Sequence, residues 1–115
     1  MTNNEEFWNI IDKLVAESEI VIDRPKGSHH PKHPNFVYKL DYGYLSGSNS
    51  MDGEGIDVWV GSDDRKQIDA IICIVDYLKK ESEIKILIGC TEKEKQIIYQ
   101  THNEYENMKG ILVRR

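Results

Sequence analysis

The segments Ile68-Asp-Ala-Ile-Ile-Cys-Ile-Val-Asp-Tyr77 and Ile84-Lys-Ile-Leu-Ile88 are the two strongest strand candidates in the chain. Both are dominated by apolar, mostly β-branched residues, a composition that favours strands. Between them lies the charged sequence Lys79-Lys-Glu-Ser82, which predicts a turn. The fold is therefore expected to contain two strands joined by a short connection.

Shorter strand candidates and two helices accompany this pair. Strands are predicted over Ile20–Ile22, Phe36–Leu40, Ile56–Val60 and Ile111–Val113. Apolar residues at helical spacing predict a helix over residues 5–17, and the capping-box sequence Thr91-Glu-Lys-Glu94 predicts another over about 92–107. The three prolines lie in residues 25–35, which predicts a loop there. About five strands with a helix at each end indicate an α+β domain, a small closed OB-like β-barrel.

Length and composition exclude several classes of protein. The 115 residues fit a single domain, and the net charge of −5 argues against binding to nucleic acid through phosphates. The longest wholly apolar run, Ala70–Val75, is far shorter than the ~20 residues of a membrane helix. Cys73 and Cys90 match no metal or redox spacing and are expected to be buried free thiols. We therefore expect a soluble cytoplasmic protein with no nucleic-acid or membrane partner.

The acidic residues are concentrated in one segment. Residues 51–64 contain five acids and no base, and three of these acids, Asp52, Glu54 and Asp57, fall in the sequence Met51-Asp-Gly-Glu-Gly-Ile-Asp-Val58. Carboxylates so close together repel one another unless a divalent cation lies between them. An oxygen-only ligand set suits Mg²⁺ or Mn²⁺ better than Zn²⁺. The segment predicts either a metal site or a solvent-exposed acidic turn.

Three motifs in order carry a resemblance to a known family. They are Val21-Ile-Asp-Arg24, then Tyr38-Lys-Leu-Asp-Tyr-Gly-Tyr44, then Asp52-Gly-Glu-Gly-Ile-Asp-Val58. The set resembles the soluble, Mg²⁺-dependent inorganic pyrophosphatases, whose central pattern is an Asp-Gly-Asp-Pro-x-Asp loop preceded by a Tyr-Pro-x-x-Tyr-Gly strand and an arginine. The similarity covers residues 20–60 well and residues 67–90 more loosely.

The resemblance implies metal ligands and a catalytic base. Asp52 and Asp57 match metal ligands of the family, with Asp57 bridging two Mg²⁺ ions. Glu54 stands where the family has the aspartate that deprotonates the attacking water, and it is one methylene longer. Glu83 matches a further metal ligand, and Asp76 is the nearest candidate for another, at an imperfect offset.

The resemblance also implies residues that bind the phosphate groups of the substrate. Arg24 and Tyr42 match phosphate-binding positions, and Lys85, two residues after Glu83, matches a phosphate-side lysine. Tyr105 matches the tyrosine of a C-terminal Tyr-Lys pair, although Glu106 stands in place of the lysine. Taken alone, the tyrosines have the alternative of simply packing within strands.

Departures from the family pattern keep more than one function open. Typical members begin with strands that supply a lysine and two glutamates, whereas this chain has a helix there, so it resembles a shortened relative. Lys26 and Lys32 could replace part of that charge. The leading expectation is Mg²⁺-dependent hydrolysis of pyrophosphate or a related phosphoanhydride. The alternatives are a metal- or phosphate-binding relative without turnover, and an interaction module. Exposed apolar surface left by shortening would favour a homodimer or higher homo-oligomer.

The histidines and tryptophans have plainer interpretations. His29, His30 and His33 are expected in a proline-rich surface loop, with phosphate contacts as the next alternative and a transition-metal site as a further one. His102 is expected on the surface of the C-terminal helix, and both tryptophans, Trp8 and Trp59, are expected in the core or against a partner.

Overall fold

The computed structural model describes residues 3–50 and 53–115. Within these ranges the chain forms two helices and six strands, in line with the predicted α+β class. Their bounds, in chain order, are α1 Asn3–Ala16, β1 Glu19–Arg24, β2 Asp41–Ser46, β3 Ile56–Val60, β4 Ala70–Asp76, β5 Glu81–Ile88, α2 Glu92–Thr101 and β6 Met108–Arg114.

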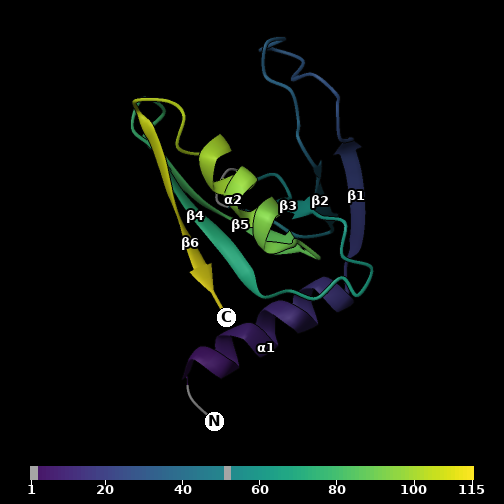
Figure 1. Cartoon of the computed structure of the whole chain (residues 1–115). Helices are drawn as coiled ribbons and strands as arrows, with labels where there is room; N and C mark the ends of the chain where they lie inside the picture. The colour runs from purple at the N-terminus through teal and green to yellow at the C-terminus, as the bar shows by residue number, and fades with distance from the viewer. Residues whose placement is uncertain (1–2, 51–52) are drawn as a thin grey trace.

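All six strands belong to one mixed sheet, in the order β1-β2-β3-β5-β4-β6 (Figure 1). β3 and β5 are parallel, and the other neighbours are antiparallel. Six strands agree with the predicted number of about five, but the predicted closure into a barrel is wrong. In the described part of the chain β1 and β6 remain separate edges. Closure is not needed to bury the sheet, because a helix packs on each of its faces.

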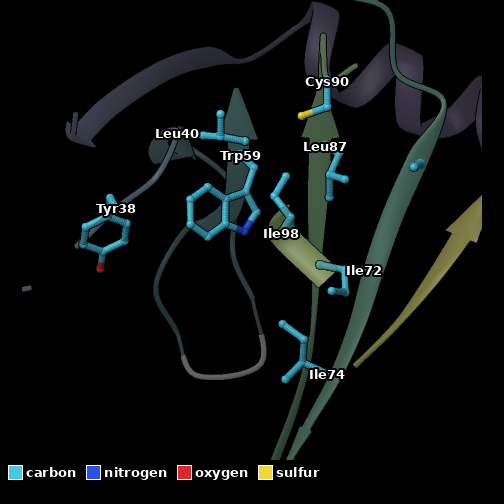
Figure 2. Packing of buried hydrophobic residues seen from close by; sticks show 9 residues of the cluster. Tyr38, Leu40, Trp59, Ile72, Ile74, Leu87, Cys90 and Ile98 are labelled. Atoms are coloured by element: carbon cyan, nitrogen blue, oxygen red, sulfur yellow. The ribbon is translucent and has the colours of Figure 1, made fainter. Parts of the chain in front are cut away.

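The first face of the sheet packs against α2. Alternate residues of a strand point to opposite faces, and Trp59 of β3, Ile72 of β4 and Leu87 of β5 all point toward Ile98 of α2. Figure 2 shows the indole of Trp59 between Tyr38 and Ile98. Trp59 is only 2% exposed, which confirms its predicted place in the core.

The second face packs against α1. The intervening residues Val58, Ile71 and Ile86 form a separate cluster with Trp8 and Ile11 of the helix. The apolar periodicity that predicted a helix over residues 5–17 is therefore the stripe by which α1 covers this face. Trp8 is buried, as expected. The chain thus has two cores, one on each side of a single sheet.

A glycine allows β1 and β2 to approach closely. A Cβ atom on Gly43 would collide with the backbone carbonyl of Val21, so no larger residue fits there without a shift of the backbone. The pairing of the two strands is irregular between Val21 and Arg24, beside this glycine. Gly43 also lies next to Tyr42 in the sequence, so this contact helps to position the tyrosine.

The predicted strand over Phe36–Leu40 is wrong. This segment pairs with the proline-rich loop rather than with the sheet. The backbone N–H of Tyr38 donates to Ser28 and its carbonyl accepts from Gly27, at 2.9 and 2.7 Å. Proline has no backbone N–H, and only an isolated bridge between His29 and Val37 forms. The segment between β1 and β2 consequently extends beyond the sheet as a long loop (Figure 1), and the strand begins at Asp41.

The C-terminal helix is shorter than predicted and ends at Thr101 instead of about residue 107. The side chain of Asn103 explains the stop. Its amide nitrogen donates to the carbonyls of Tyr99 and Gly110, and its oxygen accepts from the N–H of Gly110. Asn103 therefore satisfies the end of α2 and ties it to β6, which is longer than the predicted strand. At the other end of α2 the predicted capping box is present, between Thr91 and Glu94.

Two further observations concern the whole described chain. Neither helix in residues 3–50 and 53–115 is long and apolar enough to cross a membrane. Cys73 and Cys90 are both free thiols, as expected, and Cys90 is buried whereas Cys73 is half-buried. Burial raises the pKa of Cys90 to about 12, so its thiol stays protonated and unreactive.

Candidate functional site

Strand alternation places most of the predicted site residues on the face that carries α2. Tyr42 of β2 lies opposite Trp59, and Asp57 is two residues before Trp59 on β3, so both share the face of that tryptophan. On β5, Glu83 and Lys85 precede Leu87 at even spacing and point to the same side. Residues from three strands therefore converge at one place.

Lys85 is the centre of this convergence. Its Nζ lies 2.6 Å from the hydroxyl of Tyr42, 2.9 Å from Oδ2 of Asp57 and 2.7 Å from Oε1 of Glu83. The tyrosine hydroxyl in turn donates to Oδ2 of Asp57 at 2.6 Å. Lys85 is 5% exposed, while the two carboxylates are about one third exposed. A buried cation is therefore held between two acids that remain accessible to solvent. We call these four residues the Lys85 cluster.

The tyrosine of the Lys85 cluster acts as a neutral donor. Burial raises the pKa of Tyr42, and the neighbouring carboxylate of Asp57 raises it further because a phenolate there would face a like charge. The hydroxyl therefore keeps its proton, which it donates to the carboxylate of Asp57, while one of its lone pairs accepts from Lys85.

A cavity of about 780 Å³ opens beside the Lys85 cluster. Tyr42, Glu83 and Lys85 line it, as do two other predicted residues, Asp76 at the end of β4 and Tyr105 between α2 and β6. Half of the remaining wall residues are aromatic or basic. Five of the residues predicted from sequence thus share one cavity, although no contact described above tests their chemical roles.

The other predicted residues are placed differently. Arg24 pairs with Asp23 at 3.5 Å and also interacts with the hydroxyl of Tyr38, a residue of the cavity wall. Glu54 is exposed, and its backbone carbonyl accepts hydrogen bonds from Ser50. Neither Arg24 nor Glu54 is part of the cavity wall among the described residues. Asp52 lies outside the described residues.

His102 is a wall residue that the sequence analysis placed wrongly. It was expected on a helix surface, but it is 6% exposed and its Nε2 accepts a hydrogen bond from Nε1 of Trp59 at 3.1 Å. Because α2 ends at Thr101, His102 caps the helix and turns inward instead of continuing its outer face. Burial lowers the pKa of His102 to about 3, so the imidazole is neutral. No local pattern in the sequence signals this pairing with Trp59, which is distant along the chain.

The described residues offer ligand atoms of the right kind for a divalent cation, but few of them. Asp57 and Glu83 offer hard oxygen ligands of the kind that Mg²⁺ prefers. However, residues 3–50 and 53–115 contain no group of three acidic, histidine or cysteine side chains placed to hold a metal. The ammonium of Lys85 lies where the two carboxylates meet. A metal at this place would have to share or replace that ammonium.

Comparisons with solved structures identify proteins of similar fold. Two solved structures resemble the chain, each at 14% identity and each covering 83% of this chain and 81% of the other. One is an inorganic phosphatase from Anaplasma phagocytophilum, with a TM-score of 0.57, and one is an inorganic pyrophosphatase from Helicobacter pylori, with a TM-score of 0.51. At this identity they show a shared fold.

The sequence comparisons give a more specific result. No curated protein matches the chain. The family model for inorganic pyrophosphatase matches residues 14–112, which include β1 to β5, α2 and most of β6. Because that match spans well over half of the sequence, the chain belongs to the inorganic pyrophosphatase family.

Proposed function

We propose that this chain hydrolyses inorganic pyrophosphate to phosphate with Mg²⁺. The observation that carries the proposal is the convergence of Tyr42, Asp57, Glu83 and Lys85, three of which line the large cavity. Family membership supports the same reaction. A phosphoanhydride is a dense anion, and its hydrolysis needs fixed positive charge and hydrogen-bond donors near the oxygens of both phosphates.

In this proposal the acids hold metal and deprotonate water. Asp57 and Glu83, together with Asp52 and Asp76, hold Mg²⁺, which when bound neutralises substrate charge and lowers the pKa of water. Glu54 accepts the proton of the attacking water. Its position in the motif, three residues before Asp57, supports this role, as do its exposure and its carboxylate chemistry.

The remaining predicted residues bind the phosphate groups. Lys85 is well suited to this task because its ammonium is fixed by three contacts and shielded from water, which strengthens its attraction to an anion. Tyr42 adds a hydroxyl that stays protonated. Arg24 and Tyr105 complete the set at the margins of the cavity, Arg24 through its contact with Tyr38.

Phosphate release from pyrophosphate tests the proposal. We expect release by the wild type with Mg²⁺ and a loss of about 100-fold or more in Asp57→Asn, because removing a metal-ligand charge forfeits several kcal/mol of transition-state stabilisation. Asp64→Asn is the matched control. It makes the same change in the same acidic segment at an exposed residue. Absence of phosphate release by the wild type with Mg²⁺, Mn²⁺ or Co²⁺ would refute the proposal.

The second candidate function is binding of metal or phosphate without turnover. The ion pairs of Lys85 favour it, since they already occupy both carboxylates that would hold a metal. Calorimetry separates the two functions. A binding protein gives heat with inorganic phosphate, loses that heat in Lys85→Met and shows no hydrolysis with any of the three metals.

We also propose a cytoplasmic location and self-association. The free thiols of Cys73 and Cys90 support a reducing compartment. Exposed apolar side chains on the α1 side of the open sheet, among them Ile84 and Ile111, support a homodimer or higher homo-oligomer. Sedimentation of the purified chain at micromolar concentration tests self-association, and a single monomeric species would count against it.

A further inference from the structure

The cavity beside the Lys85 cluster is larger and more aromatic than inorganic pyrophosphate requires. Its volume of about 780 Å³ falls within the range of sites that enclose an organic ligand, roughly 300–1,000 Å³. Pyrophosphate is small and has no apolar surface. The wall nevertheless includes five large aromatic side chains, which are Phe36, Tyr38, Tyr42, Trp59 and Tyr105. Such a wall suits a ligand with a flat apolar part.

The aromatic side chains form a connected surface that begins at the Lys85 cluster. The ring of Tyr42 lies 5.3 Å from that of Tyr38, which lies 5.0 Å from Phe36. The imidazole of His30 is nearly parallel to the Tyr38 ring, at an interplanar angle of 14°. Aromatic faces of this kind are the surfaces on which proteins stack nucleobases. The surface reaches away from Lys85, where the phosphate groups would bind.

A polar donor in the wall has no partner among the described residues. His102 lies in the cavity wall and is only 6% exposed. Its Nε2 accepts the indole hydrogen of Trp59, which assigns the proton of the neutral imidazole to Nδ1. Within the described residues this buried Nδ1 makes no hydrogen bond. Buried donors are normally satisfied, so this orphan Nδ1 favours a bound state in which the wall shifts and a ligand supplies the acceptor.

Basic side chains line the same cavity on the side of the proline-rich loop. Lys32, Lys79 and His33 belong to the wall, and their charges reach His30, where they add to burial in lowering its pKa. Four acids line the cavity as well, which are Asp76, Glu81, Glu83 and Glu106. The wall therefore offers positive charge that attracts an anionic ligand, and carboxylate acceptors for the amino groups of a base.

We propose that this cavity binds a nucleotide, with its phosphate chain at Lys85 and Tyr42 and its base against His30 and Phe36, which cover the buried ring of Tyr38. The inference rests on the proposed function for the placement of the phosphates. An isoprenoid diphosphate shares the phosphate chemistry, but its aliphatic chain has no acceptor for His102 and no flat face for the aromatic rings. The observations favour the base.

Two diphosphate analogues that differ only in the nucleoside provide the test. The full chain is titrated by calorimetry with α,β-methylene adenosine diphosphate and with methylenediphosphonate, both resistant to hydrolysis. We expect the nucleotide analogue to bind at least about tenfold more tightly, since stacking of one base contributes roughly that factor or more. Equal affinity for the two analogues, or tighter binding of geranyl diphosphate than of the nucleotide analogue, would overturn the proposal.

Substitutions then locate the base. Phe36→Ala and, separately, His30→Ala should weaken the nucleotide analogue about fivefold or more and change the affinity for methylenediphosphonate less than twofold. Phe7→Ala is the matched control, because Phe7 is 42% exposed and lines a different cavity on the α1 face. If both loop variants bind the nucleotide analogue as the control does, the base does not lie where we place it.

The outcome is separable from that of the pyrophosphatase proposal. Tight binding of the nucleotide analogue by a chain that releases no phosphate from pyrophosphate would refute the proposed hydrolysis and support the nucleotide site. Efficient hydrolysis of pyrophosphate with equal affinity for both analogues would support the proposed hydrolysis and refute the nucleotide site.

Discussion

Replacing Lys85 by methionine tests whether the Lys85 cluster holds the protein together as well as forming its candidate site. Methionine nearly matches the length of lysine but removes the charge. Asp57 and Glu83, which both lie within 3 Å of the lysine Nζ, would then face each other without a cation, and the hydroxyl of Tyr42 would lose a donor. We expect the variant to fold and to be less stable.

The magnitude follows from two opposing terms. At an effective dielectric constant of about 20, each ion pair at this distance is worth about 6 kcal/mol of gross attraction. Burying the ammonium of Lys85 costs several kcal/mol, which offsets much of that gain. Because Asp57 and Glu83 are one third exposed, water restores part of their hydration when the lysine is removed. We therefore expect Lys85→Met to lower the free energy of unfolding by about 1–3 kcal/mol, less than the loss of a fully buried pair.

Urea unfolding followed by tryptophan fluorescence measures this change, and a double-mutant cycle assigns it. The free energy of unfolding is determined for the wild type, Lys85→Met, Asp57→Asn and the double variant. Residues in direct contact should show a coupling energy of about 1 kcal/mol. Lys109→Met, a lysine on the exposed edge strand, controls for the loss of a positive charge. A Lys85→Met protein as stable as the wild type, with no coupling to Asp57, would refute the geometry of the cluster.

Three further predictions concern the scaffold. Between pH 3 and 6.5 the unfolded chain binds a proton at His102 that the folded chain excludes. The free energy of unfolding should therefore fall with falling pH by up to about 1.4 kcal/mol per pH unit. His102→Gln should remove this part of the pH dependence of urea unfolding. In the same assay, Gly43→Ala should lower the free energy of unfolding by about 2–3 kcal/mol, because the new Cβ meets the carbonyl of Val21. Gly47→Ala, at positive φ but in open space, should lower it by about 1 kcal/mol. Equal losses would contradict the close approach of β1 and β2. Thr91→Ala, which removes the cap of α2, should cost about 1 kcal/mol, and an unchanged midpoint would contradict the capping box.

The elements of the fold that could be predicted from the sequence are those fixed by local patterns. The apolar segments of β4 and β5 and the capping box at Thr91 were recognised because each depends on neighbouring residues. The end of α2 was not, because Asn103 stops the helix through contacts with Gly110 on a later strand. The open sheet was missed for a related reason. Whether two edge strands meet depends on the curvature and packing of the whole sheet, which local sequence patterns do not encode.

The candidate site likewise contains residues that local patterns predict and residues that they do not. Motif order named Tyr42, Asp57, Glu83 and Lys85, and strand alternation then brings them to one face, so their meeting follows from register as well as from resemblance. The places of the aromatic wall residues and of His102 could not be predicted from strand alternation. Several of these residues lie on the loop between β1 and β2 and on the turn after α2. These segments have no regular backbone repeat, so the sequence pattern does not show where their side chains point.

This division bears on what the cavity recognises. The motif residues Tyr42, Asp57, Glu83 and Lys85 lie at the end where the phosphate groups would bind, and they are held by the regular sheet. His30 and Phe36, which no motif named, line the aromatic end and lie on an irregular segment, where binding specificity can change without disturbing the core. A site built in this way can keep the chemistry of a family while accepting a larger ligand. The contrast between rigid strands under Lys85 and the loop that carries His30 and Phe36 is therefore a physical reason to seek the distinctive ligand of this chain at the aromatic end of the cavity.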